Sequence, residues 1–192
     1  MPDPTFKTAQ QQREATADRL AGLPRDLQSA APWGWSTWRY QHDDGHGPVR
    51  KEIEPGAFGD FASVLDSLRG PSSVSSGIGF ELSAPMNLLV ITLRGAFQRH
   101  RAEHTKKLVH GFGSYAERSL DDEDLQIIAR GECRAFAHVS PRIDIDVTCG
   151  PRFIVCTGKH EPTSPSALGF ADRAMLDSLR LRGVPTDTLI YR

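Results

Sequence analysis

Two apolar stretches separated by a short turn decide the fold: Gly77-Ile-Gly-Phe-Glu-Leu82 and Leu88-Leu-Val-Ile-Thr-Leu-Arg94. Both have the length and the β-branched or aromatic content that is typical of strands. The second is almost continuously apolar, which predicts a strand buried on both of its faces. Because only a short link separates the two stretches, we expect them to be neighbours in one sheet.

Upstream, the sequence predicts a hairpin followed by a helix. Trp35–Gln41 alternates aromatic and polar residues as a half-buried strand does. An Asp- and Gly-rich turn follows, so we expect the pairing strand at about Val49–Ile53. Apolar residues then recur at helical spacing between Phe58 and Leu68, and Gly70-Pro71 should end that helix.

The N-terminal segment is expected to lie outside the main fold. Residues 5–22 are polar and compatible with a helix, but their apolar residues are too sparse for a strong amphipathic stripe. We therefore predict an N-terminal helical arm, loosely docked, over residues 1–23, and one folded domain over residues 24–192.

Further strands and two helices are predicted downstream. One helix carries charges at helical spacing between Phe97 and Val109, and a last helix is expected at about Ala167–Leu181. Strand-like runs lie at Tyr115–Ser119, Leu125–Ala129, Ile143–Val147 and Phe153–Cys156. A mixture of strands and helices in one unit of this length predicts an α/β or α+β domain.

Composition restricts the classes of function. The chain has 192 residues with 39% hydrophobic and 24% charged, and 23 basic against 24 acidic residues give a net charge of -1. No bulk field would draw the molecule to nucleic acid or to a membrane, so a nucleic-acid partner needs a local patch. The longest apolar run is far shorter than the roughly 20 residues of a spanning helix. We expect a cytoplasmic protein without a membrane anchor.

Six short motifs in chain order resemble those of one known family. They are Trp35-Ser-Thr-Trp-Arg39, Phe58–Leu65, Gly77–Leu82, Ser114-Tyr-Ala-Glu-Arg-Ser119, Leu125–Gly131 and Arg152–His160. Over about residues 23–180 the chain is similar to the primase-polymerase domain of phage and plasmid replication proteins, a branch of the archaeo-eukaryotic primase superfamily. The resemblance implies two fused sheet units with helices and a central crevice.

The catalytic positions of that family are mostly substituted here. Its Asp-x-Asp pair of metal ligands falls on Thr92 and Arg94, and its catalytic-strand histidine falls on Gln126. Only the third acid is retained, as Asp146. Polymerases of this kind hold two divalent ions on three carboxylates, so the resemblance implies a site that holds no metal and needs no cofactor.

Other family positions are retained. The resemblance assigns nucleotide binding to Arg152, Thr157, Gly158 and His160. The loop 120–124, which is small and Ser- and Gly-rich in the family, here carries four carboxylates that would repel a triphosphate. Thr92 and Arg94 share one strand face by the two-residue period, and we expect Arg94 to form an ion pair with Asp146 in the former metal site.

These positions leave three functions open. The first is a catalytically degenerate primase-polymerase-like protein of a phage, plasmid or other mobile element that binds nucleic acid or a replication partner. The second is an active DNA primase/polymerase with a rearranged site, in which Asp144 and Asp146 would bind Mg²⁺ or Mn²⁺. The third is a protein adaptor or antagonist of a replication enzyme. Oligomeric state is not predicted.

A charged segment near residue 100 has several interpretations. Arg99, Arg101, Lys106 and Lys107 form the best local basic patch and would contact nucleic-acid phosphates, or they form only a solvated helix face. His100-Arg-Ala-Glu-His104 matches the zinc pattern H-x-x-E-H, for which the same solvated face is the alternative.

The tryptophans and cysteines are expected to be structural. Trp33, Trp35 and Trp38 could stack on single-stranded bases, but Trp35 and Trp38 are better explained as core residues. Cys133, Cys149 and Cys156 lack metal-ligand spacing, so we predict three buried thiols.

Overall fold

The computed structural model describes residues 9–40, 53–132, 135–140, 143–180 and 184–185 as a mixed α/β chain. The described helices are α1 (Ala9–Ala21), α2 (Arg25–Ala30), α3 (Phe61–Arg69), the 3₁₀ helix η1 (Ala84–Met86), α4 (Ala102–Phe112) and α5 (Arg173–Arg180). The described strands are β1 (Trp35–Tyr40), β2 (Ile53–Gly59), β3 (Gly77–Leu82), β4 (Leu88–Leu93), β5 (Ala116–Arg118), β6 (Leu125–Arg130), β7 (Phe136–Ser140), β8 (Ile143–Thr148), β9 (Arg152–Cys156) and β10 (Val184–Pro185).

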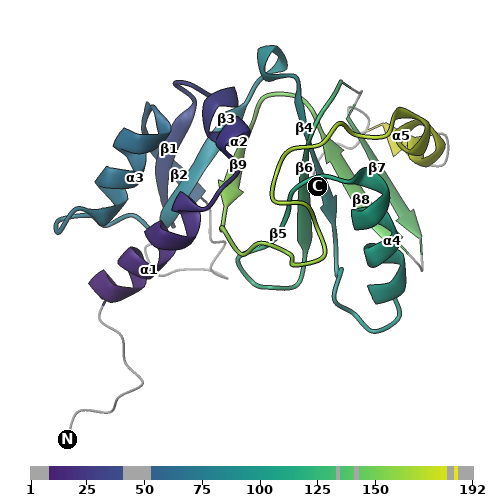
Figure 1. The fold of residues 1–192 in the computed structure, drawn as a ribbon, viewed down its shortest axis with the longest axis horizontal. Coiled ribbons are helices and arrows are strands. Elements are labelled where there is room, and N and C mark those ends of the chain that lie inside the picture. Colours follow the sequence, from purple (N-terminus) through teal and green to yellow (C-terminus); the bar gives the residue numbers. More distant parts are fainter. Residues whose placement is uncertain (1–8, 41–52, 133–134, 141–142, 181–183, 186–192) are drawn as a thin grey trace, which may run out of the picture.

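The strands form two antiparallel sheets that lie beside each other (Figure 1). The smaller sheet has the order β2-β1-β3-β9, and the larger has the order β10-β7-β8-β4-β6-β5. Helices α1, α2 and α3 lie with the smaller sheet, whereas α4 and α5 lie with the larger one (Figure 1). The expected mixed α/β class with two sheet units is therefore present.

The expectation that β3 and β4 are neighbours is wrong. Strand β3 lies between β1 and β9, and β4 lies between β6 and β8, so each has both edges paired within a different sheet. The link between them contains η1 and ends at Asn87, whose φ of 51° is in the left-handed region that asparagine tolerates. This turn passes the chain from one sheet to the other.

The buried residues form two hydrophobic cores, and the first core contains residues of α1, α2, α3 and the smaller sheet. Helix α1 is therefore an integral part of the first core and not a loosely docked arm. Ala17 and Leu20 are fully buried and belong to the same core as Trp35 and Phe80 of the smaller sheet. Of the α1 residues whose side chains the structure describes, only these two are buried, and one of them is an alanine, which explains why the apolar stripe is weak in the sequence. The boundary expected at residue 23 does not separate this helix from the core.

Strand β4 is buried on both faces, as its apolar sequence predicts. Leu88 and Val90 face the first core, whereas Leu89, Ile91 and Leu93 face a second core between the larger sheet, α4 and α5. The alternation continues to Thr92, which leaves the first core and lines a cavity. Strand β4 therefore contributes apolar side chains to both cores, and its Thr92 lines the cavity.

Several element boundaries differ from the expected ones. Helix α3 begins after Asp60, whose carboxylate accepts a hydrogen bond from the Ser63 amide, and it ends at Gly70. Strand β2 occupies residues 53–59, so Phe58 lies in this strand and not in the predicted helix. Residues 49–52 of the expected pairing strand lie outside the described residues. Strand β7 has no counterpart in the prediction.

The two later helices are shorter or shifted. The first charged residues near 97–101 form turns, and α4 extends beyond Val109 to Phe112, where Gly113 ends it with φ 55°. Residues 167–171 are not helical, and their backbone forms hydrogen bonds to Tyr115 and Arg130. Helix α5 begins only at Arg173. In the described part of the chain, no helix has both the length and the apolar character to cross a membrane.

Candidate functional site: a crevice between the two sheets

A crevice of about 300 Å³ lies where the larger sheet meets β9 of the smaller sheet. One wall is apolar and comes from Ile53, Phe153, Ile154 and Val155. The other wall is formed by the larger sheet and the loop after β5, through Val90, Thr92, Arg94, Ser119, Leu120, Asp121, Asp124, Gln126, Asp146 and Thr148. Arg152 also lines the crevice, at the start of β9.

The four residues at the positions that the resemblance marks as catalytic, Thr92, Arg94, Gln126 and Asp146, all line this crevice. Thr92 of β4 is paired with Gln126 of β6 on one side and with Asp146 of β8 on the other. Residues that are paired across adjacent strands point to the same face of the sheet. Thr92, Gln126 and Asp146 therefore form one row, and Arg94 extends it two residues further along β4.

Two guanidinium groups converge on the Asp146 carboxylate. Nη2 of Arg94 lies 3.7 Å and Nη1 of Arg152 lies 3.4 Å from the same oxygen, Oδ2. The Asp146 side chain is 13% exposed, whereas those of Arg94 and Arg152 are 51% and 47% exposed. The expected Arg94–Asp146 ion pair is thus present. Arg152 forms a second ion pair with Asp146, which the sequence analysis does not predict.

The donor set does not fit a pair of divalent metal ions. Asp144, the second acid of the alternative metal site, lies 3.9 Å from Nη1 of Arg101 and does not line the crevice. Asp146 itself is paired with cations. Within the described ranges, no three His, Cys, Asp or Glu residues are grouped so that they could hold a metal ion. Two-metal phosphoryl transfer needs more carboxylate oxygens than this row supplies.

The acidic loop after β5 forms one end of the crevice and is held in place by its own hydrogen bonds. Asp124 accepts a hydrogen bond from the Gly95 amide at 2.8 Å. Asp121 accepts bonds from the Ser119 hydroxyl and the Glu123 amide, and these bonds, that of Ser119 foremost, hold the pKa of Asp121 below its ordinary value. The Asp121 carboxylate therefore stays charged at the crevice.

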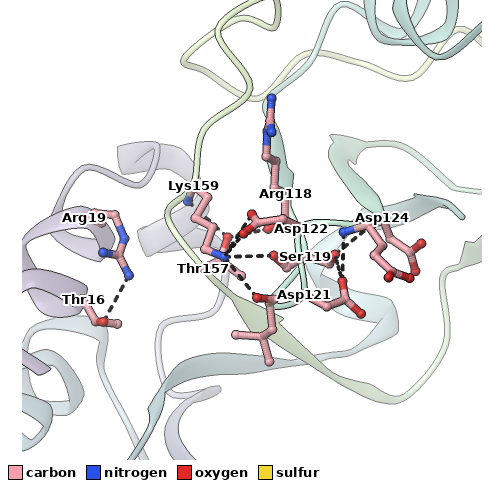
Figure 2. Close-up of polar contacts among 11 residues, drawn as sticks. Thr16, Arg19, Arg118, Ser119, Asp121, Asp122, Asp124, Thr157 and Lys159 are labelled. Atoms are coloured by element: carbon pink, nitrogen blue, oxygen red, sulfur yellow. Dashed lines mark hydrogen bonds and ion pairs between the residues drawn. The ribbon is translucent and has the colours of Figure 1, made fainter. Parts of the chain in front are cut away.

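Lys159 ties this loop to the segment after β9 (Figure 2). Its Nζ donates to both carboxylate oxygens of Asp122 at 3.0 Å and to the carbonyl of Leu120 at 3.1 Å. No sequence pattern distinguishes this lysine, because its partner Asp122 lies 37 residues away in the chain. The ammonium group offsets one of the four loop carboxylates.

Three of the four residues assigned to nucleotide binding lie away from the crevice. The amides of Thr157 and Gly158 donate to the two carboxylate oxygens of Glu117 at 2.9 and 3.0 Å. His160 stacks on Tyr115 with ring centroids 5.3 Å apart. Of the four, Arg152 lines the crevice, and the other three hold the end of β9 against β5. Their nucleotide-binding role stays a prediction for which this geometry supplies no support.

Glu117 joins the two retained motifs at a fully buried position. Besides the amides of Thr157 and Gly158, the Tyr115 hydroxyl donates to it at 2.9 Å. Burial raises the pKa of Glu117 to about 7, against the effect of these three donors. We call Glu117 with its three donors the carboxylate clamp. The carboxylate clamp joins β5 to the segment that follows β9.

The predicted basic patch is only partly a surface feature. Arg101 donates from Nη1 to the Arg94 carbonyl at 2.7 Å and faces Asp144, so it positions the end of β4. Lys106 pairs with Glu103 at 3.3 Å on the surface of α4. Arg99 and Lys107 are exposed. Nucleic-acid binding by this patch stays a prediction.

The zinc interpretation of His100 and His104 lacks the helix that it requires. His100 lies in the turns before α4, whereas His104 lies within α4, so the two are not one turn apart on a single helix. Trp35 and Trp38 are core residues as expected, with 0% and 2% exposure, and Trp33 is 74% exposed. Cys156 is buried, Cys149 is only partly buried, and Cys133 lies outside the described residues.

Sequence reasoning missed the apolar wall of the crevice. Phe153 and Val155 alternate along β9 with Ile154 and Cys156, which belong to the first core. That alternation is visible in the sequence, but it does not show that the second face borders a cavity. Comparison of the chain with models of known protein families and with curated proteins found no match to either.

Proposed function

We propose that the protein is a primase-polymerase-like protein without nucleotidyl-transfer activity, and that it binds nucleic acid in the crevice between its two sheets. The observation that carries the proposal is the state of Asp146. It is the acid of the row Gln126–Thr92–Asp146, and two arginines already form ion pairs with its Oδ2. Phosphoryl transfer by two metal ions has too few ligands there.

The arginines that neutralise Asp146 are also suited to hold a phosphate. About half of each side chain is exposed, and a guanidinium carries five N–H donors, of which Asp146 takes few. A phosphodiester can accept the remaining donors through charge-assisted hydrogen bonds. Asp121 and Asp124 at the crevice end disfavour a densely charged triphosphate more than a backbone phosphate with a single charge.

The absence of catalysis is tested by primer extension. The purified chain is incubated with a primed template, deoxynucleotides and Mn²⁺ or Mg²⁺, beside its Asp146→Ala variant. We expect no extension by either protein. Extension by the parent that is lost in Asp146→Ala would overturn the proposal in favour of an active enzyme with a rearranged site.

Binding is tested by fluorescence anisotropy with a labelled oligonucleotide. The double variant Arg94→Ala/Arg152→Ala should bind at least about tenfold more weakly than the parent, because two phosphate contacts are removed. Arg69→Ala is the matched control, since Arg69 is an exposed arginine of α3 that pairs with Asp18 at 3.2 Å, outside the crevice lining. No binding by the parent, or equal loss in the control, would contradict crevice binding.

A further inference from the structure

The face of the larger sheet that lies opposite the crevice carries a second cavity, of about 170 Å³. Arg118 of β5 is paired with Leu125 of β6, and both line this cavity, whereas Gln126, the next residue of β6, lines the crevice. Because neighbouring residues of a strand point to opposite faces, the two cavities lie on the two sides of one sheet. Helix α4 packs on this face (Figure 1) and lines the cavity with Ala102, Thr105, Lys106 and Val109. We call this cavity the α4 pocket.

The bottom of the α4 pocket is apolar. It is lined by Ala96, Val109 and Leu125, which are buried members of the second core. Thr105 is buried beside them, but its hydroxyl already donates to the Ala96 carbonyl at 3.0 Å. An apolar cavity of about 150 Å³ can take up a molecule of the size of benzene. The bottom of the α4 pocket therefore has room for one ring or one short branched chain.

The mouth of the α4 pocket is charged. Arg118 lies over the Phe97 ring, with its Cζ 4.1 Å from the ring centroid, and its Nη2 lies 3.3 Å from Oε2 of Glu161. The Arg118 side chain points away from the acidic loop after β5 (Figure 2). Lys106 is exposed and pairs at 3.3 Å with Glu103, which does not line the pocket. Two cations and one carboxylate therefore surround the opening.

These charges favour a ligand with a single negative charge. Arg118 and Glu161 neutralise one another, so Lys106 is the unbalanced charge of the lining. A guanidinium has five N–H donors, and Glu161 lies close to only one nitrogen of Arg118, which leaves other donors for a ligand. Both cations can donate charge-assisted hydrogen bonds to a carboxylate. The nearby Glu161 carboxylate disfavours an anion with two charges.

We infer that the α4 pocket binds a small monocarboxylate, with a ring or short branched chain in the apolar bottom and the carboxylate between Lys106 and Arg118. The inference goes beyond the proposed function, because the α4 pocket and the crevice share no lining residue. A ligand of about nine non-hydrogen atoms fills the pocket. So small a ligand gains limited free energy on binding, and we expect a dissociation constant on the order of 0.1 to 1 mM.

The experiment titrates the isotopically labelled full chain with three ring compounds and follows the backbone amide signals by NMR. The probes are benzoate, which is an anion, benzamide, which has the same shape without a charge, and benzylamine, which is a cation at neutral pH. We expect benzoate to shift the amides around the α4 pocket and to bind at least about fivefold more tightly than benzamide. Benzylamine should bind most weakly. Equal affinities for benzoate and benzamide, or tightest binding of benzylamine, would overturn the inference.

Two matched pairs of variants locate the bound probe. Lys106→Met removes the charge but keeps an unbranched side chain, so it should weaken benzoate binding about fivefold and leave benzamide binding unchanged. Lys107→Met is its control, because Lys107 is exposed on the same helix and does not line the pocket. Ala102→Leu places a larger side chain at the pocket wall and should weaken benzoate and benzamide alike, at least about tenfold. Ala62→Leu is its control, at an exposed position of α3.

The results for the α4 pocket can be separated from those for the crevice. Absence of amide shifts around the pocket at about 10 mM benzoate would overturn the inference. Equal weakening of benzoate binding by Lys106→Met and Lys107→Met would overturn it as well. A thermal melt of each variant distinguishes lost binding from unfolding, and the exposed lysine variants test the inference even if Ala102→Leu is unstable. None of these outcomes bears on nucleic-acid binding, which primer extension and anisotropy test at other residues.

Discussion

Asp146 has two cationic partners, and this redundancy changes what each arginine contributes to stability. Arg94 and Arg152 are both half exposed, so each single pair is comparable to a surface ion pair. Arg94→Ala or Arg152→Ala alone should cost less than about 1 kcal/mol, because the carboxylate keeps one partner. The double variant should cost roughly 1 to 3 kcal/mol, since a mostly buried carboxylate then has no cation.

Urea unfolding of the parent, the two single variants and the double variant measures this difference. The double variant should lose more stability than the two single variants together. Adding Asp146→Asn to the double variant should restore part of the loss, because the uncompensated charge is removed. Additive single effects would show that the contributions of the two arginines are not coupled through Asp146.

Glu117 should make stability depend on pH in a direction unusual for a carboxylate. Burial raises the pKa of Glu117 to about 7 in the folded chain, whereas the unfolded chain has the ordinary value near 4.5. The folded state then binds more protons between these values, so its contribution is fully present below about pH 4.5 and is lost as pH rises through about 7. At about 1.4 kcal/mol per pKa unit, the loss is on the order of 3 kcal/mol.

The comparison of parent with Glu117→Gln isolates this group. The difference in free energy of unfolding between the two should change over pH 4.5 to 7 and be constant above it. Tyr115 and Cys156 face the same buried region, and burial raises the pKa of both, so neither adds a charge in that range. A pH-independent difference between parent and variant would mean that Glu117 stays charged throughout.

Helix α1 should be required for stability. Leu20 is fully buried in the first core, beside residues of the smaller sheet. Leu20→Ala should cost about 2 to 4 kcal/mol, through lost burial and the cavity that remains. Gln12→Ala, on the exposed side of α1, should change stability by less than about 0.5 kcal/mol. A thermal or urea melt decides between this result and a loosely docked arm, for which both variants would melt like the parent.

The strands with strong apolar patterns could be predicted from sequence, because burial itself imposes the pattern. Strand β4 is an example, since its alternate residues face two different cores. Partners in a sheet could not be predicted in the same way. The chain between β3 and β4 is short, yet both strands are already paired on each edge, and Asn87 redirects the chain between sheets. Which strands pair depends on all the strands of the chain together, and a local stretch of sequence does not contain that information.

The candidate site could be predicted in part. Thr92, Gln126 and Asp146 meet because register pairs them across three strands, and the two-residue period places Arg94 on their face. Thr157 and Gly158 belong to the carboxylate clamp, because their backbone amides donate to Glu117 of β5. His160 lies beside the clamp, where its ring stacks on Tyr115. Backbone donors do not depend on the side chain, so the sequence carries no trace of this role.

The near-zero net charge of the chain predicts that nucleic-acid binding depends only weakly on salt. With a net charge of -1, no long-range field adds to the local contacts. If Arg94 and Arg152 are the two phosphate contacts, the logarithm of the affinity for single strands should fall with the logarithm of salt concentration with a slope of about -1.4.

Anisotropy titrations between low and moderate salt give this slope directly. Arg94→Ala/Arg152→Ala should bring it close to zero. Lys106→Ala/Lys107→Ala should leave it unchanged, because that part of the basic patch lies on α4 and does not line the crevice. If the parent has a slope steeper than about -1.4 and Lys106→Ala/Lys107→Ala makes it shallower, nucleic acid also contacts α4.

The order in which the strands join the smaller sheet determines when the crevice can exist. Strand β9 pairs with β3, for example Ile78 with Cys156, but it follows β4 to β8 in the chain. A ribosome must therefore release the strands of the larger sheet through β8 before the smaller sheet receives its fourth strand. Closing so long a loop delays that pairing relative to local contacts. The two sheets are consequently not exchangeable modules, and no fragment that ends before Arg152 can contain the crevice.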